Sequence, residues 1–117
     1  MTQQKRFDLR SGHIWLDGKF VDWKKAKIHV LTHGLHYGSC VFEGSRVYDG
    51  KIFKLNEHTE RLYNSAKLLG FKIPYSKKKI SSVSKLLIKK QKIKNGYVRP
   101  VAWRGSEMMA ISAQKTT

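Results

Sequence analysis

The chain has 117 residues, which fits one domain at roughly 100–200 residues per domain. Its 24 Lys and Arg against 8 Asp and Glu leave a formal net charge of +16, and this balance favours anionic partners or a lysine-rich solvated surface. The single cysteine, Cys40, excludes an internal disulfide, and no stretch approaches the roughly 18 apolar residues of a membrane span, so a cytoplasmic protein is expected.

The amino-terminal half predicts two β-hairpins. Residues 1–12 are polar, and a flexible amino terminus is expected there. The segments 13–23 and 45–55 each place Asp-Gly between β-forming residues, at Asp17-Gly18 and Asp49-Gly50. Asp-Gly in this setting indicates a two-residue turn with positive φ at both positions. We therefore expect four strands in two hairpins, joined by a β-leaning, glycine-rich stretch.

The next two segments predict helices. The helix at 55–70 is expected to begin at an Asn56 cap and to stop at Gly70, with a buried face of Leu62, Ala66 and Leu69. The helix at 76–92 is expected to begin at a Ser76 cap, with a buried stripe of Ile80, Val83, Leu87 and Leu86. Its lysines occupy the remaining positions, which favours a solvated face over a nucleic-acid surface, since the latter more often interleaves Arg and exposed aromatics.

A fifth strand is predicted at 97–103, where Pro100 indicates an edge or a bulge because it lacks an N–H donor. The chain as a whole is thus expected to be an α+β domain. The sequence shows neither internal repeats beyond the hairpins nor a low-complexity tract.

Several residues could carry chemistry, and most have a plainer structural interpretation. His29, His33 and His36 have a spacing that could bind a metal on a helix, but structural histidines are favoured in this glycine-punctuated segment. Cys40 beside His36 suggests a nucleophile pair, yet a small buried cysteine is favoured.

Two charged residues, Glu43 and Arg99, remain candidates. Glu43 could be a general base or form a structural ion pair with Arg46. Arg99 lies on a strand beside Tyr97, where its planar fork suits a carboxylate.

Three motifs, taken in order, resemble a known family. They are HGLHYGSCVFEGSR at 33–46, EHTERLYNSAK at 57–67 and YVRP at 97–100. From about Ile14 to Met109 the chain resembles the amino-terminal region of branched-chain amino-acid aminotransferases, which are fold-type IV (class IV) pyridoxal-phosphate enzymes. The resemblance implies a small α+β domain of antiparallel hairpins and two helices at 13–105, with 106–117 as the start of an interdomain region.

The resemblance also implies roles for particular residues. Arg61 matches the arginine that holds the cofactor phosphate, although a helical arginine by itself suggests a surface position. Tyr37 and Phe42 match residues that line the side-chain pocket, the tyrosine across a dimer interface. Tyr97 and Arg99 match residues near the substrate carboxylate. Glu43 and Arg46 match positions with a mainly structural role, and neither a catalytic residue nor a metal site is assigned.

The implied reaction is transamination of leucine, isoleucine or valine with 2-oxoglutarate through pyridoxal 5′-phosphate. In the family the Schiff-base lysine lies on a large domain downstream of the YxRP strand. We therefore expect a truncated chain that is inactive alone and that self-associates or binds a large domain. The alternatives are one subunit of a split aminotransferase, or a basic nucleic-acid-binding remnant.

Overall fold

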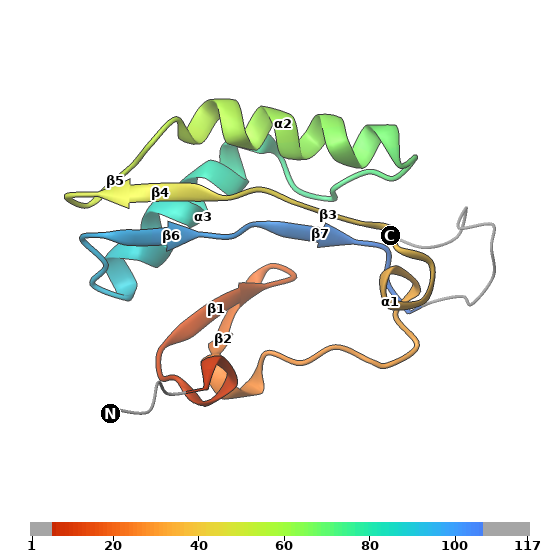
Figure 1. Cartoon of the computed structure of the whole chain (residues 1–117), viewed down its shortest axis with the longest axis horizontal. Coiled ribbons are helices and arrows are strands. Elements are labelled where there is room, and N and C mark those ends of the chain that lie inside the picture. Colours follow the sequence, from red (N-terminus) through yellow and green to blue (C-terminus); the bar gives the residue numbers. More distant parts are fainter. Residues whose placement is uncertain (1–5, 107–117) are drawn as a thin grey trace.

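A long two-stranded ribbon runs through the centre of the structure, a computed structural model that describes residues 6–106. Strand β3 (Cys40–Phe42) pairs antiparallel with β7 (Val101–Trp103), and β4 (Ser45–Tyr48) pairs antiparallel with β6 (Gly96–Val98). Because β3 leads into β4 and β6 leads into β7, the two pairs form one ribbon (Figure 1). The α+β fold expected from the sequence is confirmed.

The ribbon is interrupted where Glu43-Gly44 faces Arg99-Pro100. Pro100 has no N–H to donate to a strand partner, but its carbonyl accepts a hydrogen bond from the Glu43 backbone N–H at 3.0 Å. The single strand predicted at 97–103 is therefore two short strands. The interruption places the side chains of two candidate residues, Glu43 and Arg99, at one level of the ribbon.

Both predicted hairpins are confirmed. Strand β1 (His13–Leu16) pairs with β2 (Lys19–Asp22) around Asp17-Gly18, and β4 pairs with β5 (Lys51–Ile52) around Asp49-Gly50. All four turn residues have positive φ, from +47° to +91°, as a two-residue turn of this type requires. The first hairpin lies below the ribbon in Figure 1.

The β-leaning, glycine-rich stretch contains a helix that the sequence did not predict. Helix α1 (His33–Tyr37) ends at Gly38, whose φ is +72° and whose N–H bonds to the Gly34 carbonyl. At its start, the His33 and Gly34 N–H groups donate to the carbonyls of Gly105 and Arg104, at 2.8 and 3.2 Å. These bonds to a distant segment satisfy donors that a five-residue helix cannot satisfy internally, so tertiary contact overrides the local preference.

Both longer helices are present, with corrections at their ends. Helix α2 (Leu55–Leu68) has Lys54 at its N-cap, at φ +52°, so the predicted Asn56 cap is wrong. Leu69 is 45% exposed because it follows the last turn, whereas Gly70 does end the helix, at φ +79°.

Helix α3 (Lys77–Lys90) begins as predicted. The Ser76 hydroxyl accepts a 3.0 Å bond from the Lys79 N–H. Its buried apolar residues are Val83 and Ile88, whereas Leu86 is 55% exposed, so the predicted inclusion of Leu86 in the stripe is wrong. At 14 residues each, α2 and α3 are the longest helices, and residues 6–106 contain no helix with the length and apolarity to span a membrane.

The core lies between the ribbon and the helices. Val41 packs there with Leu62, Ala66, Phe71 and Ile73. From residue 41 to residue 48 the odd positions are buried, and the even ones are exposed or, at Gly44, partly buried, so the odd positions face the helices and the even ones the other side. Cys40 is exposed, which corrects the expectation of a buried cysteine: its strand position points away from α2.

The amino terminus is partly outside the described range. Residues 1–5 are not described. Phe7–Leu9 form a 3-10 helix, η1, that lies against a second one, η2 (Trp23–Lys25).

Candidate functional site

Three predicted site residues meet on the exposed face of the ribbon. The Arg99 guanidinium carbon lies 4.3 Å from the centre of the Phe42 ring, a distance at which a cation and an aromatic face attract each other. Its Nη2 also donates a 3.0 Å hydrogen bond to the Tyr97 hydroxyl. Phe42 and Tyr97 are 57% and 50% exposed. The result is a held guanidinium beside an aromatic surface that is open to a ligand.

Gly44 makes room for this arrangement. A Cβ atom at Gly44 would stand 1.7 Å from the Tyr97 hydroxyl oxygen, far inside contact distance. The phenol therefore lies across the position where a side chain of the strand would be. Close approach of this kind requires glycine, so Gly44 belongs to the site although it carries no functional group.

A second cluster lies on the helix side of the same interruption. The Glu43 carboxylate accepts two hydrogen bonds from Arg61, from Nε at 2.7 Å and from Nη2 at 2.8 Å. His58 Nδ1 lies 2.7 Å from Glu43 Oε1. The ion pair that the sequence suggested with Arg46 is wrong, because odd positions face α2 while Arg46 is exposed and lies over the Tyr48 ring.

The electrostatics of this cluster bear on whether Glu43 could act as a general base. The hydrogen bonds from Arg61 lower the pKa of Glu43; burial, which acts in the opposite direction, is outweighed, and His58 lowers it further. The same pair raises the pKa of Arg61. A general base works best with a pKa near the operating pH. The lowered pKa and the two bonds to Arg61 therefore favour an ionised, ion-paired Glu43 over a general base.

Arg61 retains the capacity to bind an anion. Its two bonds to Glu43 use two of the five N–H groups of a guanidinium, so three remain. Its side chain is 67% exposed. Arg61 is thus at the surface, as a helical arginine suggests, but its guanidinium is held in one orientation by Glu43. A fixed, charged fork with open donors fits a phosphate group.

Tyr37 stands apart from these residues. It is the last residue of α1 and 45% exposed, and its ring lies 4.6 Å from the His33 imidazole. Within residues 6–106 no ring contact joins it to Phe42 or Tyr97. The structure therefore brings together Phe42, Tyr97 and Arg99 on the exposed face of the ribbon. Arg61 lies on the helix side, where it bonds to Glu43, the residue that follows Phe42. Tyr37 lies apart on α1.

The three histidines considered as metal ligands bond to nearby chain atoms. His29 Nδ1 accepts from the Leu31 N–H at 3.0 Å, His33 Nδ1 lies 2.7 Å from the Ser39 hydroxyl, and His36 Nε2 lies 2.7 Å from the Val30 carbonyl. In the described part of the chain, no three His, Cys, Asp or Glu residues form a group that could hold a metal.

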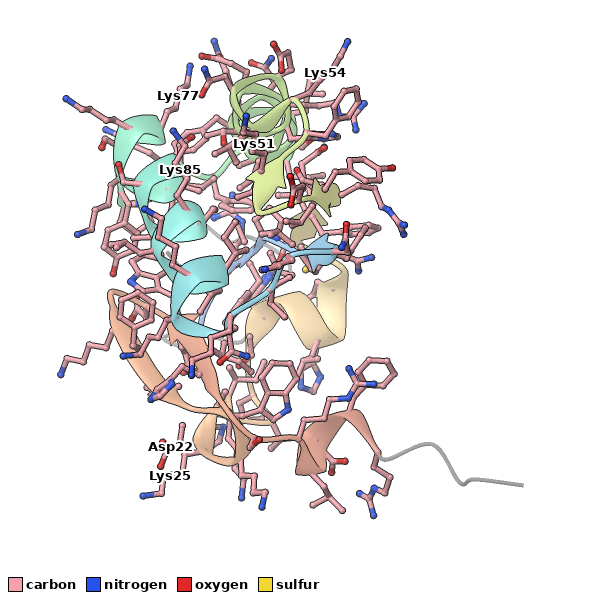
Figure 2. The ribbon with its side chains drawn as sticks, turned by 90° about the vertical axis from the view of Figure 1, so that its left-hand side faces the viewer. Asp22, Lys25, Lys51, Lys54, Lys77 and Lys85 are labelled. Atoms are coloured by element: carbon pink, nitrogen blue, oxygen red, sulfur yellow. The ribbon has the colours of Figure 1, made fainter. Side chains whose placement is uncertain are left out.

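Helix α3 carries six lysines and no acidic residue. Lys77 and Lys85 project from this helix, while Lys51 and Lys54 stand near the start of α2 (Figure 2). A polar groove of about 480 Å³ between α2 and α3 is lined by lysine, serine, threonine, asparagine and glutamate, and Lys77 pairs across it with Glu60 at 2.8 Å. The groove offers no aromatic face for a base to stack on.

The sequence motifs did not single out two residues of this region, His58 and Arg104. His58 had a usable signal, because it precedes Arg61 by three residues and such pairs share a helix face. Arg104 had none. It is only 7% exposed, and its Nη2 donates to the carbonyls of Gly70, at 2.6 Å, and Leu69, at 3.3 Å. These acceptors are more than 30 positions away, and they mark the carboxyl end of α2.

Comparison with known proteins places most of the chain in a protein family. Residues 40–117 match the model described as amino-transferase class IV. The probable branched-chain-amino-acid aminotransferase of Rickettsia felis is 52% identical over 100 residues, which cover 86% of this chain and 34% of the relative. The branched-chain-amino-acid aminotransferase of Pseudomonas aeruginosa is 44% identical over 108 residues, 89% of this chain and 35% of the relative.

A solved structure agrees with these relatives. The T.th. branched-chain amino acid aminotransferase complexed with N-(5′-phosphopyridoxyl)-L-glutamate has a TM-score of 0.88 at 38% identity, over 92% of this chain and 38% of that chain. The chain thus spans about a third of the length of the proteins that it matches.

Proposed function

Because the chain belongs to the class IV amino-transferase family, we propose that it supplies the amino-terminal part of a pyridoxal-phosphate site for branched-chain amino-acid transamination. Residues 13–105 then correspond to the small domain of the family. The following segment, proposed as the start of an interdomain region, lies almost wholly outside the described residues.

The observation that carries this proposal is a pair of arginines, each held by its neighbours. Arg61 is held by Glu43 and has open donors for the cofactor phosphate. Arg99 is held by Phe42 and Tyr97 and has an open face for the substrate carboxylate. Transamination needs both anionic groups, one on the cofactor and one on the amino acid, to be fixed relative to each other.

The other residues suit an aliphatic substrate. Phe42 presents an apolar ring against which the side chain of leucine, isoleucine or valine can pack, and Tyr37 of a second copy of the chain would extend that wall across a dimer interface. Tyr97 orients Arg99 through its hydroxyl. When bound, pyridoxal 5′-phosphate supplies an electron sink for the α-carbon. No lysine of this chain is assigned to proton transfer.

The exposed face of the ribbon also indicates a covering partner. Phe42, Tyr97 and Val101 lie on it and are 42–57% exposed, and an apolar patch of this kind marks an interaction surface. We propose that a large domain, or a second copy of the chain, covers this face in the active protein.

A chimera tests the proposal. This chain replaces the matching third of the Pseudomonas aeruginosa enzyme, and transamination of leucine with 2-oxoglutarate is measured. The chimera should be active. Arg99→Met should lower kcat/KM for leucine by roughly 10- to 150-fold, because it removes a hydrogen bond to a charged group worth about 1.5–3 kcal/mol.

Lys85→Met is the matched control, since Lys85 lies on the exposed side of α3, and its kinetics should equal those of the unsubstituted chimera. A folded, cofactor-loaded chimera without transaminase activity would contradict the proposed function.

A further inference from the structure

We propose that Glu43 and His58 are positioning residues that hold the Arg61 guanidinium in the orientation that receives a phosphate group. The inference rests on the proposed role of Arg61 and deepens it. Neither residue needs to contact the ligand. Their effect passes through the two hydrogen bonds between Glu43 and Arg61.

Glu43 is suited to this role because it is itself immobile. Its side chain is 5% exposed, and its backbone N–H is bonded to the Pro100 carbonyl at the interruption of the ribbon. Both carboxylate oxygens are engaged: Oε2 accepts from Arg61 Nε, and Oε1 accepts from Arg61 Nη2. A bidentate pair of this kind fixes the plane of the guanidinium as well as its position.

His58 completes the arrangement from the same helix as Arg61. Its side chain is 22% exposed, and Nδ1 lies 2.7 Å from Glu43 Oε1. An ionised carboxylate only accepts hydrogen bonds, so Nδ1 is the donor. This third bond opposes rotation of the Glu43 carboxylate. It thereby also holds the Arg61 guanidinium, because the guanidinium would turn with the carboxylate to which it is bonded.

The arrangement has two opposite consequences for an anion. A guanidinium already held in place loses less rotamer freedom when phosphate binds, which strengthens binding. The negative charge of Glu43 beside it repels phosphate, which weakens binding. Glu43→Gln removes the charge, keeps the shape and turns one acceptor into a donor that cannot bond to Arg61. The sign of its effect therefore separates a positioning residue from a mere neighbouring charge.

The experiment measures binding of pyridoxine 5′-phosphate to the chain. This compound lacks the aldehyde, so it does not react with surface lysines, and pyridoxine without phosphate is the control ligand. Binding is followed by the ¹⁵N–¹H signal of Arg61 Nε, assigned by its loss in Arg61→Lys, and by calorimetry. In the wild type this signal should exchange slowly with water, because Nε donates to a buried carboxylate.

Glu43→Gln and His58→Phe should each weaken binding of pyridoxine 5′-phosphate by about 10-fold. Residues that orient the ligands of a metal ion have effects of this size on metal affinity. Both changes should also speed the exchange of the Arg61 Nε proton with water. His58→Asn should restore both readouts to within about 2-fold of wild type, because its amide N–H stands near the position of Nδ1. If Glu43→Gln does not fold by circular dichroism, the His58→Phe and His58→Asn pair carries the test.

Two failures are distinguishable. Unchanged affinity in Arg61→Lys, or no saturable binding by the wild type, overturns the assignment of phosphate to Arg61. Weaker binding in Arg61→Lys together with wild-type or tighter binding in Glu43→Gln and His58→Phe overturns only the positioning role.

Discussion

Replacing Gly44 by alanine should disturb the substrate side of the site while leaving the fold intact. The backbone of Gly44 does not adopt the left-handed conformation, so alanine is compatible with it. The new Cβ would lie 1.7 Å from the Tyr97 hydroxyl oxygen and 2.4 Å from the ring carbon that carries it. Tyr97 is 50% exposed, so its ring can swing away.

The size of the effect follows from these distances. Ordinary contact begins near 3.4 Å, so the hydroxyl must move by about 1.7 Å. A displacement of that size breaks the 3.0 Å bond from Arg99. The lost bond costs about 0.5–1.5 kcal/mol, and the reduced freedom of the unfolded chain offsets about 0.4–1 kcal/mol. The net change in the free energy of unfolding should stay within about 1 kcal/mol.

Two assays check this expectation. Urea unfolding of the chain, followed by tryptophan fluorescence, measures stability. In the chimera, Gly44→Ala and Tyr97→Phe should each raise KM for leucine by roughly 2- to 10-fold, the equivalent of one lost hydrogen bond. Because both changes act on the same hydroxyl, the double variant should lie within about 2-fold of either single variant.

Either of two results would refute the reasoning. A wild-type KM in Gly44→Ala, with a raised KM in Tyr97→Phe, would show that the phenol does not depend on the space above Gly44. A loss of more than about 3 kcal/mol in stability would show that the backbone, rather than the exposed side chain, absorbs the overlap.

Three further predictions concern stability. Arg104→Met should lower the free energy of unfolding by about 2–4 kcal/mol, because it removes charged donors from the carbonyls at the end of α2. Arg99→Met, which removes one exposed hydrogen bond, should lower it by only about 0.5–1.5 kcal/mol, and equal effects would contradict the capping role. The pKa of Glu43 is lowered in the folded state, so its carboxylate adds stability above its ordinary value of about 4.3, and this contribution is lost as the pH falls through the lower folded-state value. Urea stability between pH 7 and pH 3 should therefore fall more steeply for the wild type than for Glu43→Gln, whereas parallel curves would show that the pair contributes nothing. Ser76→Ala should cost about 1 kcal/mol through loss of the helix cap, against little change for the exposed Ser82→Ala, and the same unfolding measurements decide between them.

Features that depend on a few consecutive residues were predictable from the sequence. The two Asp-Gly turns and the Ser76 cap are examples, because a turn or a cap draws its hydrogen bonds and φ values from residues within three or four positions. The proposed roles of Phe42, Tyr97 and Arg61 came from resemblance to the family, whereas that of Arg99 was also suggested by its place on a strand beside Tyr97. The structure supplies contacts compatible with these proposals.

Features that depend on contacts between distant segments were decided by the tertiary structure. Helix α1 forms because carbonyls near residue 104 accept its first N–H groups, which local preference does not encode. Glu43 pairs with Arg61 rather than with the nearer Arg46, because strand alternation turns position 43 toward α2 and position 46 away from it. The local sequence thus determined the two Asp-Gly turns and the Ser76 cap. Packing of the ribbon against α2 determined which charged residues pair, because the two faces of a strand acquire different partners only when one of them is covered.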